Sequence, residues 1–100
     1  MIVTVFRSRL KSEGEDEYGQ WATRMSELAR SMPGYVSHKI FTAADGERVT
    51  IVEFDSRENL QGWSTHPEHA QAKKRGREAF YSEYRIQVCE VLRESVFAAD

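Results

Sequence analysis

The chain has 100 residues, of which 40% are hydrophobic and 30% are charged, and its formal net charge is -2. This composition is typical of one globular domain, expected over residues 1–100, and it excludes an intrinsically disordered chain. Basic residues are interleaved with acidic ones, so nucleic acid is not expected as a partner. No apolar run approaches the roughly 18 residues of a membrane span, and the N-terminus does not resemble a signal peptide. The lone cysteine, Cys89, allows no internal disulfide, and a cytoplasmic location is expected.

The first half of the chain predicts a strand, a helix and a hairpin. Residues 2–10 are rich in Ile, Val, Thr and Phe, which indicates a strand. Acidic residues at 13–17 suit the start of a helix, and Pro33-Gly34 ends it. Residues 35–42 and 47–54 read as two strands joined by an Asp-Gly turn. Apolar residues recur through the predicted helix at steps of three and four: Tyr18, Trp21, Ala22, Met25, Leu28, Ala29 and Met32.

The second half predicts two helices and a final strand. A D-x-x-E pattern from Asp55 to Glu58 predicts a capping box for a short helix through Trp63. Thr65 is predicted to cap a second helix that runs to about Phe80, because proline and glutamate follow it in the first turn. The basic cluster at 73–77 is interpreted as the solvated face of that helix. Residues 84–93 read as the last strand.

The resulting order, β-α-β-β-α-α-β, predicts an α+β fold of the ferredoxin-like type, with a four-stranded antiparallel sheet and helices on one face. The last strand carries Ile86, Val88 and Leu92 on one face and Cys89 and Val91 on the other. A sheet with one face in water would alternate apolar and polar residues instead. The second face is therefore expected to meet another sheet, most simply in a homodimer formed through the sheet.

Three stretches carry a resemblance to a known family: MPGYVSHKIF, VEFDSRENLQGWSTHPEH and GREAFYSEYRIQVCEV. With the element order, they make nearly the whole chain resemble the antibiotic biosynthesis monooxygenase (ABM) domain family. The resemblance implies a dimeric α+β barrel with a pocket between helices and sheet. Its superfamily includes cofactor-independent quinone-forming monooxygenases, haem-degrading enzymes and domains of other roles. Fold alone does not choose among these activities.

Haem and metal binding are not favoured by the residues present. The resemblance to the haem-degrading branch would require an asparagine on the first strand, a tryptophan on the second helical segment and an iron-ligating histidine beyond it. Trp63 matches, but residues 6–9 contain no asparagine and Lys73 stands at the ligand position. His69 remains open as an alternative iron ligand. His66 and His69 lie three apart without a third ligand nearby, which is a weak metal pattern.

Candidate site residues gather in the segment from Trp63 to Tyr84. His69 is the first candidate for a catalytic base and His66 the second, because a base works best with a pKa near the operating pH. The candidate substrate-binding residues are Phe6, Trp63, Arg77, Phe80 and Tyr81.

Each of these residues also has a structural interpretation. Trp63 can fill the space between helix and sheet, and His69 can be a satisfied core residue. Arg77 can form an ordinary surface ion pair. Gly76 allows either a close approach of helix and sheet or room for a ligand. His38, on the second predicted strand, is interpreted as a core or dimer-interface residue.

Two functions follow from these candidates. The first is a cofactor-independent monooxygenase acting on a small phenol or hydroquinone, for which no cofactor is expected. The second is a non-catalytic dimeric module that binds a small aromatic molecule or has a regulatory role. The sequence does not distinguish the two.

Overall fold

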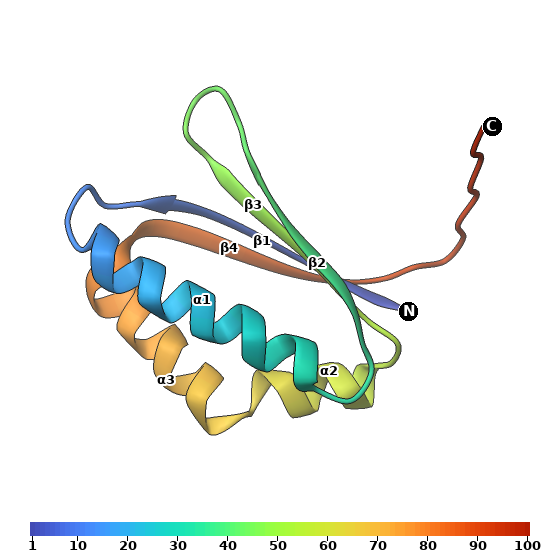
Figure 1. The fold of residues 1–100 in the computed structure, drawn as a ribbon, viewed down its shortest axis with the longest axis horizontal. Coiled ribbons are helices and arrows are strands. Elements are labelled where there is room, and N and C mark those ends of the chain that lie inside the picture. Colours follow the sequence, from blue (N-terminus) through green and yellow to red (C-terminus); the bar gives the residue numbers. More distant parts are fainter.

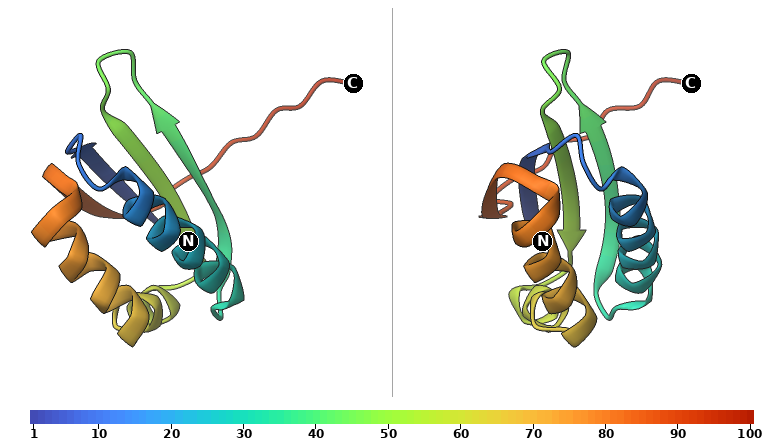
Figure 2. Two further views of the ribbon diagram at one scale, coloured as in Figure 1. Left: turned by 60° about the vertical axis from the view of Figure 1, so that its left-hand side comes forward. Right: turned by 90° about the vertical axis from the view of Figure 1, so that its left-hand side faces the viewer.

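The computed structural model describes all 100 residues. The sheet has the order β2-β3-β1-β4, and every neighbouring pair is antiparallel. The helices lie on one side of the sheet (Figures 1 and 2), which confirms the predicted ferredoxin-like fold. The elements in chain order are β1 (Ile2–Leu10), α1 (Glu15–Ser31), β2 (Tyr35–Thr42), β3 (Arg48–Phe54), α2 (Arg57–Ser64), α3 (Pro67–Arg75), a π-helical turn η1 (Gly76–Phe80) and β4 (Tyr81–Glu90).

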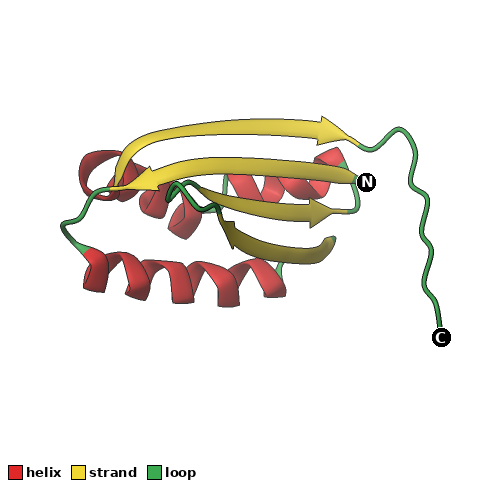
Figure 3. Ribbon diagram, turned by 90° about the horizontal axis from the view of Figure 1, so that it is seen from above, coloured by secondary structure: helices red, strands yellow, loops and turns green.

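The two sides of the sheet are distinguished by strand β1. Ile2 is buried and pairs with Phe54 of β3, which is the most deeply buried residue of the core at 0% exposure. Because side chains alternate along a strand, Thr4 and Phe6 point to the same side as Ile2. We call this the helix-facing side. The opposite side, which no helix covers, is called the open face (Figure 3).

The core lies between α1, α2 and the end of β3. Phe54 packs with Ala29 of α1 and Trp63 of α2, and partly buried apolar residues surround the three. The apolar spacing predicted for the first helix therefore faces the sheet as expected. The surrounding residues are Met25, Leu28, Met32, Tyr35, Val52 and Leu60.

The residues that cap α2 and α3 differ from the prediction by one position. Ser56 caps α2, where its hydroxyl accepts a hydrogen bond from the Asn59 backbone N–H at 3.1 Å. Asp55 is held elsewhere: its backbone N–H donates to the Gly34 carbonyl at 2.9 Å, and its carboxylate accepts from the Asn59 side chain at 2.8 Å. The predicted box at Asp55 is therefore wrong, because this residue ties β3 to the turn before β2.

The cap of α3 is His66, and the predicted cap at Thr65 is wrong. The Thr65 hydroxyl donates back to the Gln61 carbonyl at 2.9 Å and closes the end of α2. His66 follows it and accepts the Glu68 backbone N–H. Thr65 is not the cap because the first backbone N–H of α3 to be capped, that of Glu68, donates to His66.

Removing the α2 cap tests this assignment. Ser56→Ala is expected to lower the free energy of unfolding by about 1 kcal/mol, because the Asn59 backbone N–H loses its hydrogen-bond acceptor. Urea denaturation followed by circular dichroism measures the loss. Ser56→Asp keeps an acceptor and should retain most of the stability. An equal loss in both variants would contradict the assignment of Ser56 as the cap.

The second helical segment ends at Phe80 as predicted, with a π-helical last turn, whereas the limits of β4 differ from the prediction. The helix leaves regular geometry at Arg75, passes through η1 and enters β4 at Tyr81, three residues before the predicted strand. At the other end, β4 stops at Glu90 because β1 offers no partner beyond Ile2 and Met1. Leu92, predicted on the strand, is 93% exposed and belongs to a C-terminal segment that extends away from the body (Figure 1).

Candidate functional site

The strongest contact among the predicted site residues joins Trp63 and His69. Their rings stack with centroids 3.9 Å apart and an interplanar angle of 11°. His69 Nδ1 also lies 3.0 Å from the Trp63 carbonyl oxygen. Trp63 is only 7% exposed and contacts the core, so it holds His69 against a rigid surface. The two rings can meet because α2 ends at Ser64 and α3 starts at Pro67, so the chain turns between Trp63 and His69.

The hydrogen bond determines the tautomer of His69. A carbonyl oxygen only accepts hydrogen bonds, so Nδ1 carries the proton in neutral His69 and Nε2 has a free lone pair. Burial lowers the pKa of His69 to about 4, and the positive charges of Lys73 and His66 act in the same direction. His69 is therefore neutral at pH 7, with Nε2 available as an acceptor.

The other candidate base, His66, has the opposite tautomer. Its Nδ1 accepts the Glu68 backbone N–H at 3.1 Å as the cap of α3. In neutral His66 the proton must therefore lie on Nε2, which makes that atom a hydrogen-bond donor. Of the two histidines, only His69 presents an unprotonated Nε2 while its structural hydrogen bond is intact.

A second aromatic group lies where β4 begins. Phe6 contacts Tyr81 edge-on with centroids 5.4 Å apart, and Tyr18 contacts Phe80 in the same way at 5.7 Å. The Arg48 guanidinium lies 5.2 Å above the Tyr18 ring. Burial raises the pKa of the Tyr81 hydroxyl, so it stays protonated. The sequence predicts Tyr18 only as a residue of the apolar face of the first helix, because helical spacing gives no signal of its contact with Phe80.

Between these two aromatic groups, the edge of the sheet is uncovered on its helix-facing side. Ile86 pairs with Phe6 and Val88 pairs with Thr4, so both share the face of Phe6. They are nevertheless 48% and 59% exposed. The main neighbours of α3 are α1, α2 and η1, and it leaves this part of β4 open. We call Phe6, Ile86 and Val88 the uncovered strip.

A buried polar atom lies beside the strip. The Thr4 hydroxyl oxygen is buried and has no hydrogen-bond partner. A hydroxyl without a partner costs about 1–3 kcal/mol relative to a bonded one. Thr4 pairs with Val52 on one side and Val88 on the other, so its surroundings on the sheet are apolar.

Three further residues considered in the sequence, Gly76, Arg77 and His38, lie outside the two aromatic groups. A Cβ on Gly76 would lie 2.5 Å from Tyr81 Cε2, so this glycine allows close approach. Arg77 is exposed and forms no ion pair, whereas its neighbour Arg75 pairs with Glu17 at 2.6 Å. His38 is partly buried between Ser26 Oγ at 3.2 Å and the Tyr35 hydroxyl at 2.7 Å, on the helix-facing side.

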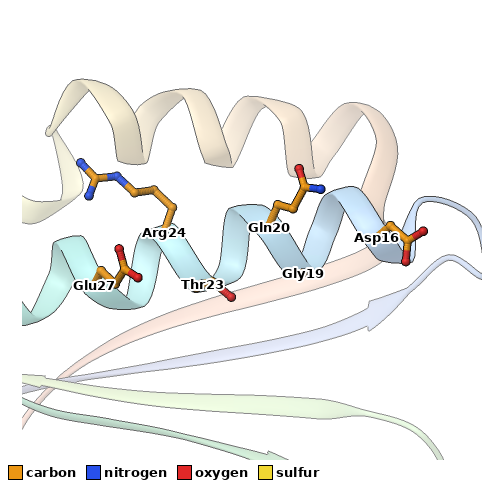
Figure 4. Close-up of a pocket in the computed structure, with 6 residues that line it drawn as sticks. All are labelled: Asp16, Gly19, Gln20, Thr23, Arg24 and Glu27. Carbon is orange, nitrogen blue, oxygen red and sulfur yellow. The ribbon is translucent and has the colours of Figure 1, made fainter.

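Two surface hollows lie away from these residues. One, of about 590 Å³, follows α1 alone and has no hydrophobic lining, and its side chains all come from that helix (Figure 4). The other, of about 190 Å³, is lined by Arg7, Ser8, Glu47, Glu83, Tyr84 and Arg85. Neither includes a predicted site residue. No group of three or more His, Cys, Asp or Glu side chains could hold a metal ion, and no helix has the length and apolar character to cross a membrane.

Comparison with known proteins identifies the relatives of the chain. Residues 1–75 match the family described as Antibiotic biosynthesis monooxygenase. The chain is 37% identical to YqjZ of Bacillus subtilis (strain 168) over 93 residues, which cover 93% of this chain and 82% of that protein. Its fold is similar to that of Rv0793 from Mycobacterium tuberculosis, with a TM-score of 0.82, 19% identity and coverage of 95% and 98%. It is also similar to SnoaB, a cofactor-independent oxygenase from Streptomyces nogalater, with a TM-score of 0.77, 15% identity and 95% coverage of each chain.

Proposed function

The chain belongs to the antibiotic biosynthesis monooxygenase family, and we propose that it is a cofactor-independent monooxygenase acting on a small phenol or hydroquinone. The observation that carries the proposal is the uncovered strip together with the neutral His69 stacked on Trp63. An apolar surface binds a flat aromatic molecule, and a histidine acceptor orients its hydroxyl. The fold shared with SnoaB, a cofactor-independent oxygenase, supports the same chemistry.

The reaction needs little from the protein beyond binding and proton handling. In an anthrone-type substrate, loss of the hydroxyl proton gives an electron-rich anion that transfers an electron to dioxygen. The two radicals then combine at the ring carbon. Loss of water forms the quinone carbonyl, so one oxygen atom enters the product and the other leaves as water with the two displaced hydrogens. The substrate supplies all the electrons, which is why no cofactor is invoked.

The low pKa of His69 makes it a weak base but does not prevent this role. A phenol has a pKa of about 10 and His69 one of about 4, so proton transfer is uphill by roughly 8 kcal/mol. A barrier of that size alone still permits about 6 × 10⁶ events per second. We therefore assign His69 Nε2 as the acceptor of the substrate hydroxyl hydrogen.

The other predicted residues take supporting roles in this proposal. Phe6 and Tyr81, which are partly exposed, form apolar walls that contact the substrate. Trp63 and Phe80 are only 7% and 3% exposed, so they support the site from within the core and exclude water. His66 donates through Nε2 at the rim, and Arg77 attracts a substrate anion. These assignments follow from the types of residue and from the two aromatic groups described above.

The two histidines provide a matched test. His69→Gln is expected to reduce oxygen uptake with anthrone by at least tenfold, since the glutamine amide cannot take up the substrate proton. His66→Asn keeps a side-chain cap on α3 and should retain more than about half of the activity. Oxygen consumption and quinone absorbance are measured without added cofactor, and circular dichroism confirms folding. Activity of the wild type that is absent, or unchanged in His69→Gln, would contradict the proposal.

The second candidate function is a dimeric binding module without catalysis, and the weak basicity of His69 favours it. Such a module would bind anthrone saturably, with quenching of Trp63 fluorescence, while oxygen uptake stays at the level of the buffer. The same experiment therefore distinguishes the two functions.

A further inference from the structure

The unpaired hydroxyl of Thr4 is the one buried side-chain polar atom of the chain that no hydrogen bond explains. Native proteins leave few buried polar groups without a partner, so this group calls for a reason. Thr4 as a residue is partly exposed although its hydroxyl oxygen is buried. The part of the residue that reaches the surface is therefore not the part that could form a hydrogen bond.

Thr4 completes a block of side chains on the helix-facing side of the sheet. Strand β1 lies between β3 and β4, and Thr4 is the cross-strand partner of Val88 on β4. Two residues further along β1, Phe6 is the partner of Ile86. Because residues two apart on a strand share a face, Thr4 occupies one corner of this block and the uncovered strip forms the rest. A molecule that rests on the strip therefore lies next to Thr4.

Rotation of the Thr4 side chain can bring its hydroxyl to the strip. A threonine side chain has three staggered χ1 positions, and a step of about 120° exchanges the hydroxyl with another substituent of Cβ. The Thr4 hydroxyl loses no hydrogen bond in such a step, because it has none. It gains a bond when an oxygen acceptor lies on the strip, so binding of a ligand favours the rotated position.

The surroundings of Thr4 favour a neutral acceptor over a charged one. Its partners across the strands are Val52 and Val88, and the rest of the strip is also apolar. No cation in this block would compensate for the desolvation of a carboxylate. A ring carbonyl is neutral and only accepts hydrogen bonds, so it matches a hydroxyl donor.

We propose that the Thr4 hydroxyl donates a hydrogen bond to a carbonyl oxygen of the aromatic molecule that binds the uncovered strip. Thr4 is then a specificity-determining residue, which selects a ring ketone over a hydrocarbon of the same shape. The inference rests on the proposed function in one respect, since both use the strip as the binding surface. It adds a carbonyl group to the description of the substrate.

Equilibrium dialysis of the full chain with 9-fluorenone and fluorene tests this role. The two compounds share a flat ring system and differ in one carbonyl oxygen, and neither carries a hydroxyl for His69. Thr4→Val keeps the branched shape and removes the hydroxyl. It should weaken the binding of fluorenone about five- to tenfold, the effect of one neutral hydrogen bond, and change the binding of fluorene less than about twofold. Thr4→Ser keeps the donor and should bind both compounds like the wild type.

The stability of the same variants separates ligand binding from a structural role. Loss of an unpaired buried hydroxyl should leave the midpoint of urea denaturation unchanged or raise it, whereas loss of a bonded hydroxyl would lower it. Thr50→Val is the matched control, because Thr50 pairs with Phe6 from β3, on the side away from β4. This variant should leave the affinity for both compounds within about twofold of the wild type.

Several outcomes would overturn the role of Thr4. They are no binding of either compound to the wild type, equal effects of Thr4→Val on both compounds, and a lower urea midpoint in Thr4→Val. Because fluorenone binding is measured without turnover, failure of the proposed activity is recognised separately. Absent oxygen uptake with anthrone, together with a selective loss of fluorenone binding in Thr4→Val, would refute the activity and support the role of Thr4.

Discussion

Trp63→Ala is expected to lower the free energy of unfolding by about 3–5 kcal/mol, the range for removing a large buried aromatic side chain. Trp63 packs on Phe54 and Ala29 in the core and stacks on His69. Its loss therefore opens a cavity and frees the start of α3 together. A domain of this size has a total stability of about 5–15 kcal/mol, so the variant should be close to unfolded at physiological temperature.

The second tryptophan serves as the control for this prediction. Trp21 is partly buried on α1, where its indole N–H donates to Glu17 at 3.2 Å. Trp21→Ala should cost about 1–2 kcal/mol, within the usual range for a partly buried residue. Trp63→Phe keeps a ring beneath His69 and should lose roughly half as much as Trp63→Ala. Guanidinium denaturation gives all three values, and equal losses at both tryptophans would contradict the central position of Trp63.

The sequence is sufficient to predict the elements whose pattern is local. Strand β1 has the predicted limits, Ile2–Leu10, because its apolar residues and the acidic loop after it define both ends. Helix α1 follows the spacing of its apolar residues to Ser31. The family resemblance and the order of the elements together were enough to predict the ferredoxin-like fold. In these places local preference and tertiary packing favour the same structure.

The errors occur where a distant residue decides the outcome. Asp55 has the composition of a helix cap, but the Gly34 carbonyl and the Asn59 side chain engage it instead. The second helical segment does reach Phe80 as expected, but it widens into a π-helical turn at Gly76, where the Tyr81 ring lies against the glycine. Neither contact has a signature in the sequence near the residue it affects.

The candidate site divides in the same way. Residue type and spacing identify Trp63 and His69 as neighbours of the core, and their stacking agrees with this. The tautomers of His66 and His69 depend on which backbone group each ring contacts, which composition cannot reveal. The uncovered strip arises because α3 lies away from β4. The alternation of side chains along a strand shows which residues share a face, but it does not show whether a helix covers that face.

The stability of the protein is expected to fall by up to about 3 kcal/mol through His69 alone as the pH is lowered from 6.5 to 4. In the unfolded chain His69 has its ordinary pKa of 6.5, whereas burial lowers the value in the folded state to about 4. Between these pH values the unfolded chain binds a proton that the folded chain does not, so acid favours unfolding. The contribution is fully present above pH 6.5 and is lost by about pH 4.

His69→Gln isolates this contribution from the other groups that titrate in acid. Glutamine retains an N–H donor for the Trp63 carbonyl but carries no titrating ring. Carboxylates with lowered pKa values, such as Glu17 beside Arg75 and Glu68 beside Arg24, also lose stabilising charge, but mainly below pH 4.5, where ordinary glutamates begin to protonate. Burial also lowers the pKa of His38, but His38 is present in both proteins, so its contribution cancels when their stabilities are compared.

Urea denaturation at half-unit steps from pH 7.5 to 4 measures the free energy of unfolding of both proteins. The wild type should lose stability more steeply than His69→Gln between pH 6.5 and 4, and the two curves should run parallel above pH 7. The activity proposed for His69 has the same dependence, since only its neutral form accepts a proton, so kcat/KM should stay level down to about pH 5 and fall near pH 4. Parallel stability curves throughout, or a break in kcat/KM near pH 6.5, would contradict a neutral His69 whose pKa is lowered by burial against Trp63.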